Sequence, residues 1–129
     1  MVIDTSAVIA CLFGESERAS FISAIGTDSV RLISVVGVVE ASFVILGRKR
    51  VGGLADLQFF LDDGEIERVP VDGHQAEFAV EAFRRFGRGR HPARLNIGDC
   101  FAYALAKTTG EPLLYKGRDF AQTDIVAVA

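Results

Sequence analysis

The sequence predicts an α/β fold with a mainly parallel central sheet. Two observations lead to this prediction. Short apolar runs that contain β-branched residues recur along the chain, and the segments between them carry apolar residues at helical spacing. Strands that alternate with helices in this way are typical of a parallel sheet, because each helix returns the chain to the start of the next strand.

The expected strands are short apolar runs that lie between helical segments or at the ends of the chain. They are MVID (residues 1–4), VRLIS (30–34), EIERVPV (65–71), EPLLY (111–115) and IVAVA (125–129). Between the last two, KGRDFAQTD (116–124) is expected to form a turn or a short helix.

Residues suited to helix ends support several of the expected helices. Thr5 or Ser6 can cap the first helix, Ser34 the third and Asn96 the last, although the β-branched residues after Ser34 disfavour a helix there. The last helix is apolar nearly all round and is therefore expected to be buried. The helices expected are 5–13, 15–26, 34 to about 50, 53–64, 72–87 and 96–110.

Length and composition predict one globular domain spanning residues 1–129. No repeat, low-complexity segment or linker divides the chain, and half of its residues are hydrophobic (50%). Its net charge of −3 gives no global attraction to nucleic acid. Cys11 and Cys100 lie in apolar surroundings and are expected to be buried free thiols. Without a signal-peptide pattern or an apolar run of about 20 residues, no membrane association and a cytoplasmic location are expected.

Four carboxylates stand where a ligand site of such a fold is expected. Glu40 is the only charge in the apolar segment 34–46, and an isolated buried carboxylate is costly. Asp4 ends the first strand, Asp99 lies in the first turn of the most apolar helix, and Asp119 follows the strand EPLLY. Ligands of open α/β sheets bind beyond the carboxyl ends of the strands, so these acids are expected to converge.

Such a cluster requires a counter-charge. Two like charges 4 Å apart repel by about 4 kcal/mol at an effective dielectric constant of 20. Mg²⁺ or Mn²⁺ would remove this repulsion, whereas His74 and His91 lack the spacing of zinc ligands. Taken singly, each acid also has a structural interpretation: Asp4 as a helix cap, Asp99 as a partner of the helix dipole and Asp119 as a turn residue.

Four motifs in order make the sequence similar to a known family. MVIDTSAVIA places an Asp at the end of the first strand, and VVEASFVI places Glu40 on a helix after the second. RHPARLNIGDCFAYALAK contains Asp99, and EPLLYKGRDFAQTDI contains Asp119. Over the whole chain these motifs resemble the PIN-domain ribonucleases, and within them the VapC toxins of bacterial toxin–antitoxin pairs.

The resemblance implies a three-layer α/β/α sandwich with a central, mainly parallel sheet. It also implies an Mg²⁺-dependent (or Mn²⁺-dependent) endoribonuclease toxin, a cognate VapB-like antitoxin that blocks the site, and a homodimer. Asp4, Glu40, Asp99 and Asp119 would be the catalytic and metal-holding acids. Some relatives carry a further acid where this chain has Gly117 or Arg118, so Asp124 is an alternative or auxiliary fourth acid.

Thr5 and Ser6 have two interpretations of similar weight. Either hydroxyl would orient Asp4 or a water at the metal, or it would simply cap the first helix. The short apolar helices AVIACLF and LADLQFFL are further expected to contribute to the homodimer contact and to a groove for the antitoxin.

Two other functions remain open at this point. A non-catalytic PIN-like module would bind RNA or a partner without cutting, although the intact acid set disfavours it. A phosphatase would need a second acid two residues after the first-strand aspartate, where this chain has Ser6.

The segment from Arg84 to Arg94 contains five arginines and no acid in an otherwise acidic chain. Because it leads into the helix of Asp99, Arg88, Arg90 and Arg94 are expected to contact RNA phosphates. The alternatives are a solvated loop that balances the acidic cluster, or a surface that meets acids of the antitoxin.

Overall fold

The computed structural model describes all residues 1–129. Its strands are β1 (Val2–Ile3), β2 (Leu32–Ser34), β3 (Glu67–Val69) and β4 (Leu113–Leu114). Its helices are α1 (Thr5–Leu12), α2 (Arg18–Thr27), α3 (Val35–Arg48), α4 (Gly53–Asp63), α5 (Gly73–Phe86) and α6 (Ile97–Thr109), followed by a short 3₁₀ helix η1 (Phe120–Gln122). The alternation of strands and helices is the one that the sequence predicts.

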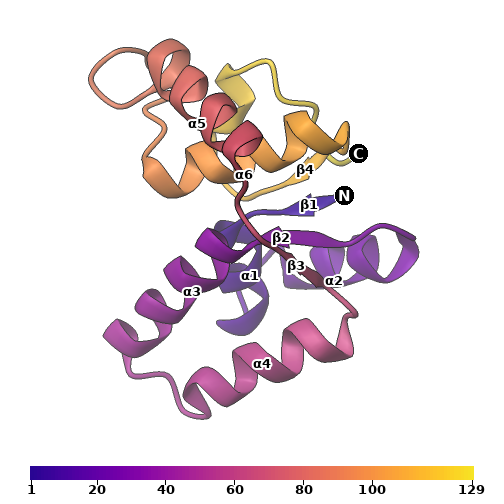
Figure 1. The fold of residues 1–129 in the computed structure, drawn as a ribbon. Helices are drawn as coiled ribbons and strands as arrows, with labels where there is room; N and C mark the ends of the chain where they lie inside the picture. Colours follow the sequence, from indigo (N-terminus) through magenta and orange to yellow (C-terminus); the bar gives the residue numbers. More distant parts are fainter.

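The four strands form one parallel sheet in the order β3-β2-β1-β4. Val2 of β1 is paired with Leu32 of β2 on one side and with Leu113 of β4 on the other. Helices α1 to α4 cover one face of this sheet, and α5 and α6 cover the other (Figure 1). The expected three-layer α/β/α arrangement is therefore confirmed, and the carboxyl ends of all four strands lie at one edge.

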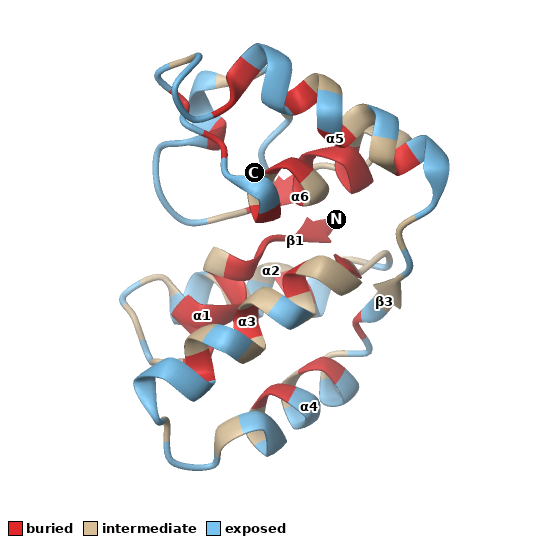
Figure 2. Ribbon diagram, turned by 60° about the vertical axis from the view of Figure 1, so that its left-hand side comes forward, coloured by how far each residue is buried: buried red, intermediate tan, exposed pale blue.

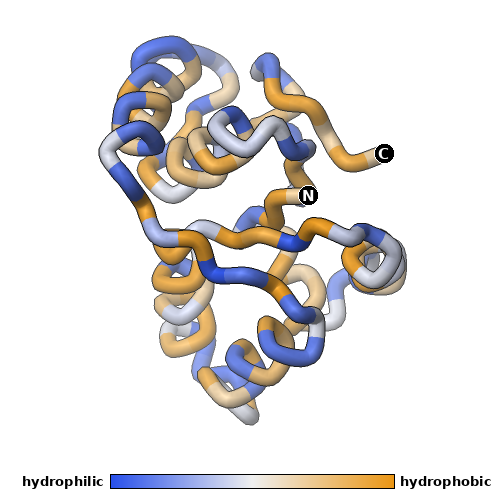
Figure 3. The backbone as a smooth tube through the Cα atoms, turned by 45° about the vertical axis from the view of Figure 1, so that its right-hand side comes forward, coloured by the Kyte–Doolittle hydropathy of each residue, from blue (hydrophilic) through white to orange (hydrophobic).

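Each face of the sheet has its own hydrophobic core, because successive strand residues point to opposite faces. Val2 and Leu113 belong to the core beneath α5 and α6, whereas Ile3 and Leu114 belong to the core beneath α1 to α4. Buried residues line the sheet and the inner helix faces (Figure 2). Hydrophobic and hydrophilic residues alternate along the helices, as expected where one side meets the sheet and the other meets water (Figure 3).

The strands are shorter than expected, and two expected elements differ further from the structure. IVAVA does not form a strand: it makes only an isolated parallel bridge between Leu113 and Ala127. Strand β4 offers only two residues for pairing, so the segment is limited to one bridge. Val126 beside the bridge stays 68% exposed, whereas Ile125 and Val128 pack against the cores. The second helix begins at Arg18 and ends at Thr27, three residues later and one residue later than its expected bounds.

The apolar helices of the first half are only partly exposed. Helix α1 buries nearly all its residues in the core, so the expectation that AVIACLF supplies an outer contact face is wrong. In LADLQFFL, Leu54 and Phe59 are exposed, and α3 adds Val39, Phe43 and Leu46. Cys11 and Cys100 are buried free thiols, as predicted. None of the helices is long and apolar enough to cross a membrane.

Candidate active site

Asp4 occupies the junction between β1 and α1, where it is 4% exposed. It is the N-cap of α1, because it is the last residue with extended backbone, and its Oδ2 accepts the backbone N–H of Ser6 at 3.0 Å. The expectation that Thr5 or Ser6 caps this helix is therefore wrong: both residues already lie inside the first turn.

The two hydroxyls after Asp4 connect α1 to other elements of the site. Ser6 Oγ donates a hydrogen bond to Asp4 Oδ2 at 2.5 Å and accepts the backbone N–H of Lys116 at 2.9 Å. This chain of hydrogen bonds ties Asp4 to the segment after β4. Thr5 Oγ1 donates instead to the carbonyl oxygen of Gly37 in α3 at 3.2 Å, and so holds the first turns of α1 and α3 together.

Glu40 lies on α3, one turn after this contact, and is half-buried. Its carboxylate makes no hydrogen bond or ion pair within the chain and rests against the backbone of Gly98. A Cβ atom at position 98 would stand only 2.2 Å from Oε2 and 2.6 Å from Oε1 of Glu40. The missing side chain of Gly98 therefore creates the space in which the Glu40 carboxylate meets the first turn of α6.

Asp99 follows Gly98 and forms a capping box with Asn96. The Asp99 backbone N–H donates to Asn96 Oδ1 at 2.9 Å, and the Asn96 backbone N–H donates to Asp99 Oδ2 at 3.0 Å. The sequence predicts this cap correctly. Asp99 lies in the first turn of α6, as expected for a partner of the helix dipole. The capping box uses only one of its carboxylate oxygens, so the other remains free for a ligand.

The pKa values show that the acids act on one another. Burial raises the pKa of Asp4 to about 6, the hydrogen bonds from Ser6 oppose this rise, and the charge of Glu40 adds to it. Burial raises the pKa of Asp99 to about 7 against the Asn96 N–H, and the charges of Asp4, Glu40 and Asp119 contribute further. The four acids thus form one electrostatic cluster, which we call the acid cluster.

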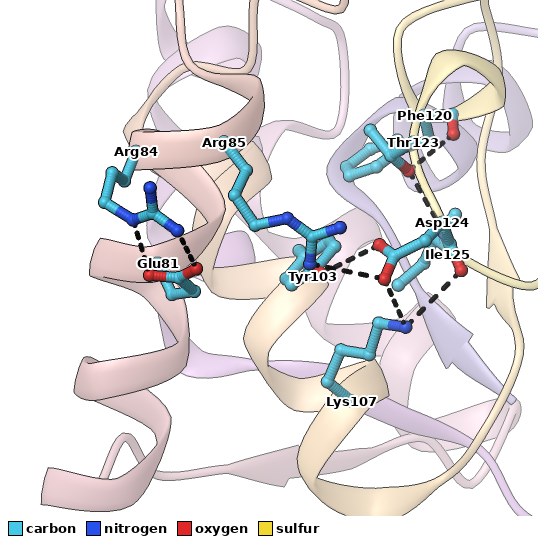
Figure 4. Close-up of polar contacts among 9 residues, drawn as sticks. All are labelled: Glu81, Arg84, Arg85, Tyr103, Lys107, Phe120, Thr123, Asp124 and Ile125. Carbon is cyan, nitrogen blue, oxygen red and sulfur yellow. Dashed lines mark hydrogen bonds and ion pairs between the residues drawn. The ribbon is translucent and has the colours of Figure 1, made fainter.

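Asp119 and Asp124 have different surroundings. Asp119 directly precedes η1, is exposed and makes no side-chain hydrogen bond. The Asp124 carboxylate accepts a hydrogen bond from Tyr103 Oη at 2.8 Å and pairs with Lys107 Nζ at 3.1 Å and with Arg85 at 3.5 Å (Figure 4). These partners hold the pKa of Asp124 below its usual range despite the opposing effect of burial.

The acid cluster has the donor chemistry of a divalent-cation site but not a closed coordination shell. In the present arrangement no three His, Cys, Asp or Glu side chains come together closely enough to hold an ion. Carboxylate oxygens are the ligands that Mg²⁺ and Mn²⁺ prefer, and Mg²⁺ usually keeps several waters. The unpartnered Glu40 carboxylate beside Gly98, and the raised pKa of two neighbouring acids, fit a site completed by a cation.

Arginines of the segment 84–94 divide into two groups. Arg84 pairs with Glu81, and Arg85 pairs with Asp124, both on the outer surface of α5 (Figure 4). Arg88, Arg90 and Arg94 are exposed and have no carboxylate partner in the chain.

The sequence reasoning missed three residues that shape the site. Gly37 and Gly98 allow close approach at two helix contacts, and Lys116 supplies the backbone N–H that fixes Ser6. A glycine inside the first turn of a helix is a detectable signal, since it lowers helix propensity without an evident gain. The Lys116 contact has no such signal, because any residue but proline offers a backbone N–H.

A parallel sheet with acids gathered beyond its carboxyl ends defines the class of this protein as an α/β domain with a candidate cation site. The family model described as "PIN domain" matches residues 1–126, and the chain belongs to this family. Ribonuclease VapC30 of Mycobacterium tuberculosis is 45% identical over 129 residues, which is 100% of this chain and 98% of that protein. The resemblance of this chain to the VapC group is therefore confirmed.

Two solved structures show the same fold. VapC20 of Mycobacterium tuberculosis, a toxin that cleaves the sarcin–ricin loop, has a TM-score of 0.77 at 19% identity, with 98% of this chain and 97% of that chain covered. A toxin–antitoxin complex from Klebsiella pneumoniae has a TM-score of 0.75 at 20% identity, with 98% and 95% covered. At such identities these similarities establish the architecture alone.

Proposed function

We propose that this protein is a toxin of the VapC type, an endoribonuclease that depends on Mg²⁺ or Mn²⁺ and is neutralised by a cognate VapB-like antitoxin. The single domain of residues 1–129 would act on RNA in the cytoplasm. The full-length similarity to Ribonuclease VapC30 supports the activity. The observation that carries the proposal is the acid cluster, in which Asp4, Glu40 and Asp119 all act on the pKa of Asp99.

The residues of the acid cluster would have distinct roles. Asp4, Glu40 and Asp99 would hold the cation, and Asp119 would complete the site directly or through a water. When bound, such an ion stabilises charge on a phosphoryl oxygen and favours deprotonation of an attacking water. Ser6 would keep the Asp4 carboxylate oriented through its 2.5 Å hydrogen bond, and Thr5 would hold α3, and with it Glu40, against α1.

The geometry of the acids supports Asp119 over Asp124 as the fourth acid. Asp119 acts on the pKa of Asp99 and has no competing side-chain partner. Asp124 is held by Tyr103 and Lys107 of α6 and by Arg85 of α5, so its carboxylate would have to leave three partners to reach an ion.

An apolar outer face supports the proposed partners. Phe43 of α3 is 70% exposed, and Val39 and Leu46 extend the same helix face beyond it. Leu54 and Phe59 add exposed apolar area on α4, which packs against α3. We assign the homodimer contact and the antitoxin groove to this region, since water-exposed apolar faces of this kind mark protein contacts.

Cleavage of RNA by matched acid variants tests the function. We expect the wild type to cut single-stranded RNA with Mg²⁺ or Mn²⁺ and not in excess EDTA. Glu40→Gln and Asp99→Asn should each reduce the rate at least about 100-fold, because even outer partners of metal ligands are worth ten- to hundredfold. Retained helical circular dichroism would exclude unfolding. Full activity in EDTA or in either variant would contradict the proposal.

A further inference from the structure

We propose that the loop between α5 and α6 binds RNA phosphates through Arg88, Arg90 and Arg94, and so holds the substrate beside the acid cluster. This inference rests on the proposed ribonuclease function and names the surface that the substrate contacts. Four observations carry it: unpaired guanidinium groups, a pinned loop backbone, an open hollow lined by the three arginines, and contact of the loop with the segments next to Asp99 and Asp119.

The lack of an acid partner separates Arg88, Arg90 and Arg94 from the arginines nearby. Arg84 donates to both carboxylate oxygens of Glu81, at 2.8 and 2.5 Å, and is thus already engaged. Arg88, Arg90 and Arg94 are exposed, and their guanidinium groups make neither an ion pair nor a hydrogen bond within the chain. A guanidinium offers a planar set of N–H donors that matches the oxygens of a phosphate. All three of these guanidinium groups are free to bind a phosphate.

The backbone of the loop is held in place before any ligand arrives. Its base is closed by two hydrogen bonds: Leu95 N–H donates to the Phe86 carbonyl at 2.9 Å, and Arg88 N–H donates to the Leu95 carbonyl at 2.9 Å. Ala93 and Leu95 are fully buried and anchor the loop in the core of α5 and α6. A pinned backbone reduces the ordering cost of binding, since only side chains need to be fixed.

The three arginines surround an open hollow of about 550 Å³. Its lining contains no hydrophobic side chain and consists of Arg88, Gly89, Arg90, His91, Pro92 and Arg94. His91 Nδ1 accepts the backbone N–H of Ala93 at 3.0 Å, so in this arrangement the ring proton sits on Nε2, which is a further donor. The guanidinium donors around this hollow suit an anion.

The loop that lines the hollow contacts the segments next to Asp99 and Asp119. On one side the loop runs directly into Asn96, the cap of α6, three residues before Asp99. On the other side the Gln122 side-chain amide of η1 donates to the Pro92 carbonyl at 3.4 Å, close after Asp119. A strand of RNA held by the arginines would lie against the loop that leads into the helix of Asp99, and their positive charge would attract the phosphates that the acid cluster repels.

The test measures RNA affinity as a function of salt. The probe is a short fluorescein-labelled single-stranded RNA, with Ca²⁺ in place of Mg²⁺ and a gel to confirm that it stays uncut. We compare the wild type with Arg88→Gln/Arg90→Gln. The matched control is Arg68→Gln/Arg84→Gln, which removes the same two charges from arginines that are paired with Asp62 and Glu81.

Each phosphate contact contributes about −0.7 to the slope of log affinity against log salt for single strands. We expect the Arg88/Arg90 variant to bind about tenfold more weakly at low salt and to flatten this slope by about one unit, while the control keeps the wild-type slope. Melting curves of both variants confirm the fold.

The remaining outcomes distinguish a failure of this inference from a failure of the proposed ribonuclease function. If the wild type cuts RNA but the Arg88/Arg90 variant keeps the wild-type slope, the function stands and the inference is wrong. If the variant keeps RNA binding but loses the cognate antitoxin in a pull-down, the hollow faces the antitoxin, and the inference is again wrong. A wild type that neither binds nor cuts RNA overturns both.

Discussion

The Glu40 carboxylate occupies the space that a side chain at Gly98 would fill, with Oε2 only 2.2 Å from the position of a Cβ atom there. The side chain of Glu40 thus fills space next to a residue that is 58 positions away in the sequence. The contact joins α3 to the first turn of α6 and brings an unpartnered carboxylate next to Asp99. The identity of residue 98 therefore controls the position of a proposed metal ligand.

Gly98→Ala should separate activity from stability. The added methyl group must displace the Glu40 carboxylate, so we expect RNA cleavage and Mn²⁺ affinity to fall about ten- to hundredfold, as for the loss of an outer partner of a metal site. Helix α6 should keep its stability or gain up to about 1 kcal/mol, because alanine favours a helix interior over glycine. Cleavage rates, Mn²⁺ titration and thermal melting measure the three effects.

The matched control for this variant is Gly47→Ala. Gly47 also lies within a helix, and a Cβ atom there would meet nothing within 4 Å. We expect this control to retain activity with a similar gain in helix stability. Equal activity of the Gly98 and Gly47 variants would show that the position of Glu40 does not matter for cleavage.

Asp119→Asn and Asp124→Asn should differ in their effects: the first should slow cleavage, and the second should mainly lower stability. Asp119→Asn removes a charge that acts on Asp99, so we expect at least about tenfold slower cleavage. Because the Asp119 side chain makes no hydrogen bond, we expect an unchanged melting temperature. The second leaves Lys107 and Arg85 without their acid. Because these ion pairs are partly exposed, we expect a loss of about 1 kcal/mol and nearly normal cleavage.

Tyr103→Phe provides the control, since it breaks the same network without changing charge. It should lower stability and leave the cleavage rate near that of the wild type. A larger loss of cleavage from Asp124→Asn than from Asp119→Asn would reverse the assignment of the fourth acid.

Local patterns in the sequence predict much of this fold. Ser34 and Asn96 accept backbone N–H groups of α3 and α6 as predicted, because capping depends only on neighbouring residues. The bounds of the strands are harder to predict from the sequence. IVAVA has a strand-like composition but makes a single bridge, since pairing depends on how many residues its neighbour β4 offers.

The candidate site was predictable in its residue types but not in its contacts. Asp4, Glu40 and Asp99 follow strand ends or lie on apolar helices, and their sequence positions already indicate convergence. The Ser6 link to Lys116 joins residues 110 positions apart and exists only because β1 and β4 are neighbours in the sheet. Sequence periodicity contains no information on such pairs.

The stability of the metal-free protein should fall as the pH rises from about 4 to about 7. Burial raises the folded-state pKa values of Asp4 and Asp99 to about 6 and about 7, above the ordinary aspartate value of 3.8, so the folded protein binds more protons than the unfolded chain in this range. The free energy of unfolding therefore decreases with increasing pH. For Asp4 alone the decrease is of the order of 3 kcal/mol, at 1.36 kcal/mol for each pH unit. Thermal melting in EDTA across this pH range measures the decrease in stability.

Asp4→Asn should flatten the pH dependence of stability and raise the melting temperature at pH 7. Saturating Mn²⁺ should do the same for the wild type by neutralising the acid cluster. A wild-type melting temperature that rises steadily from pH 4 to pH 7 in EDTA would show that the acids are not crowded together.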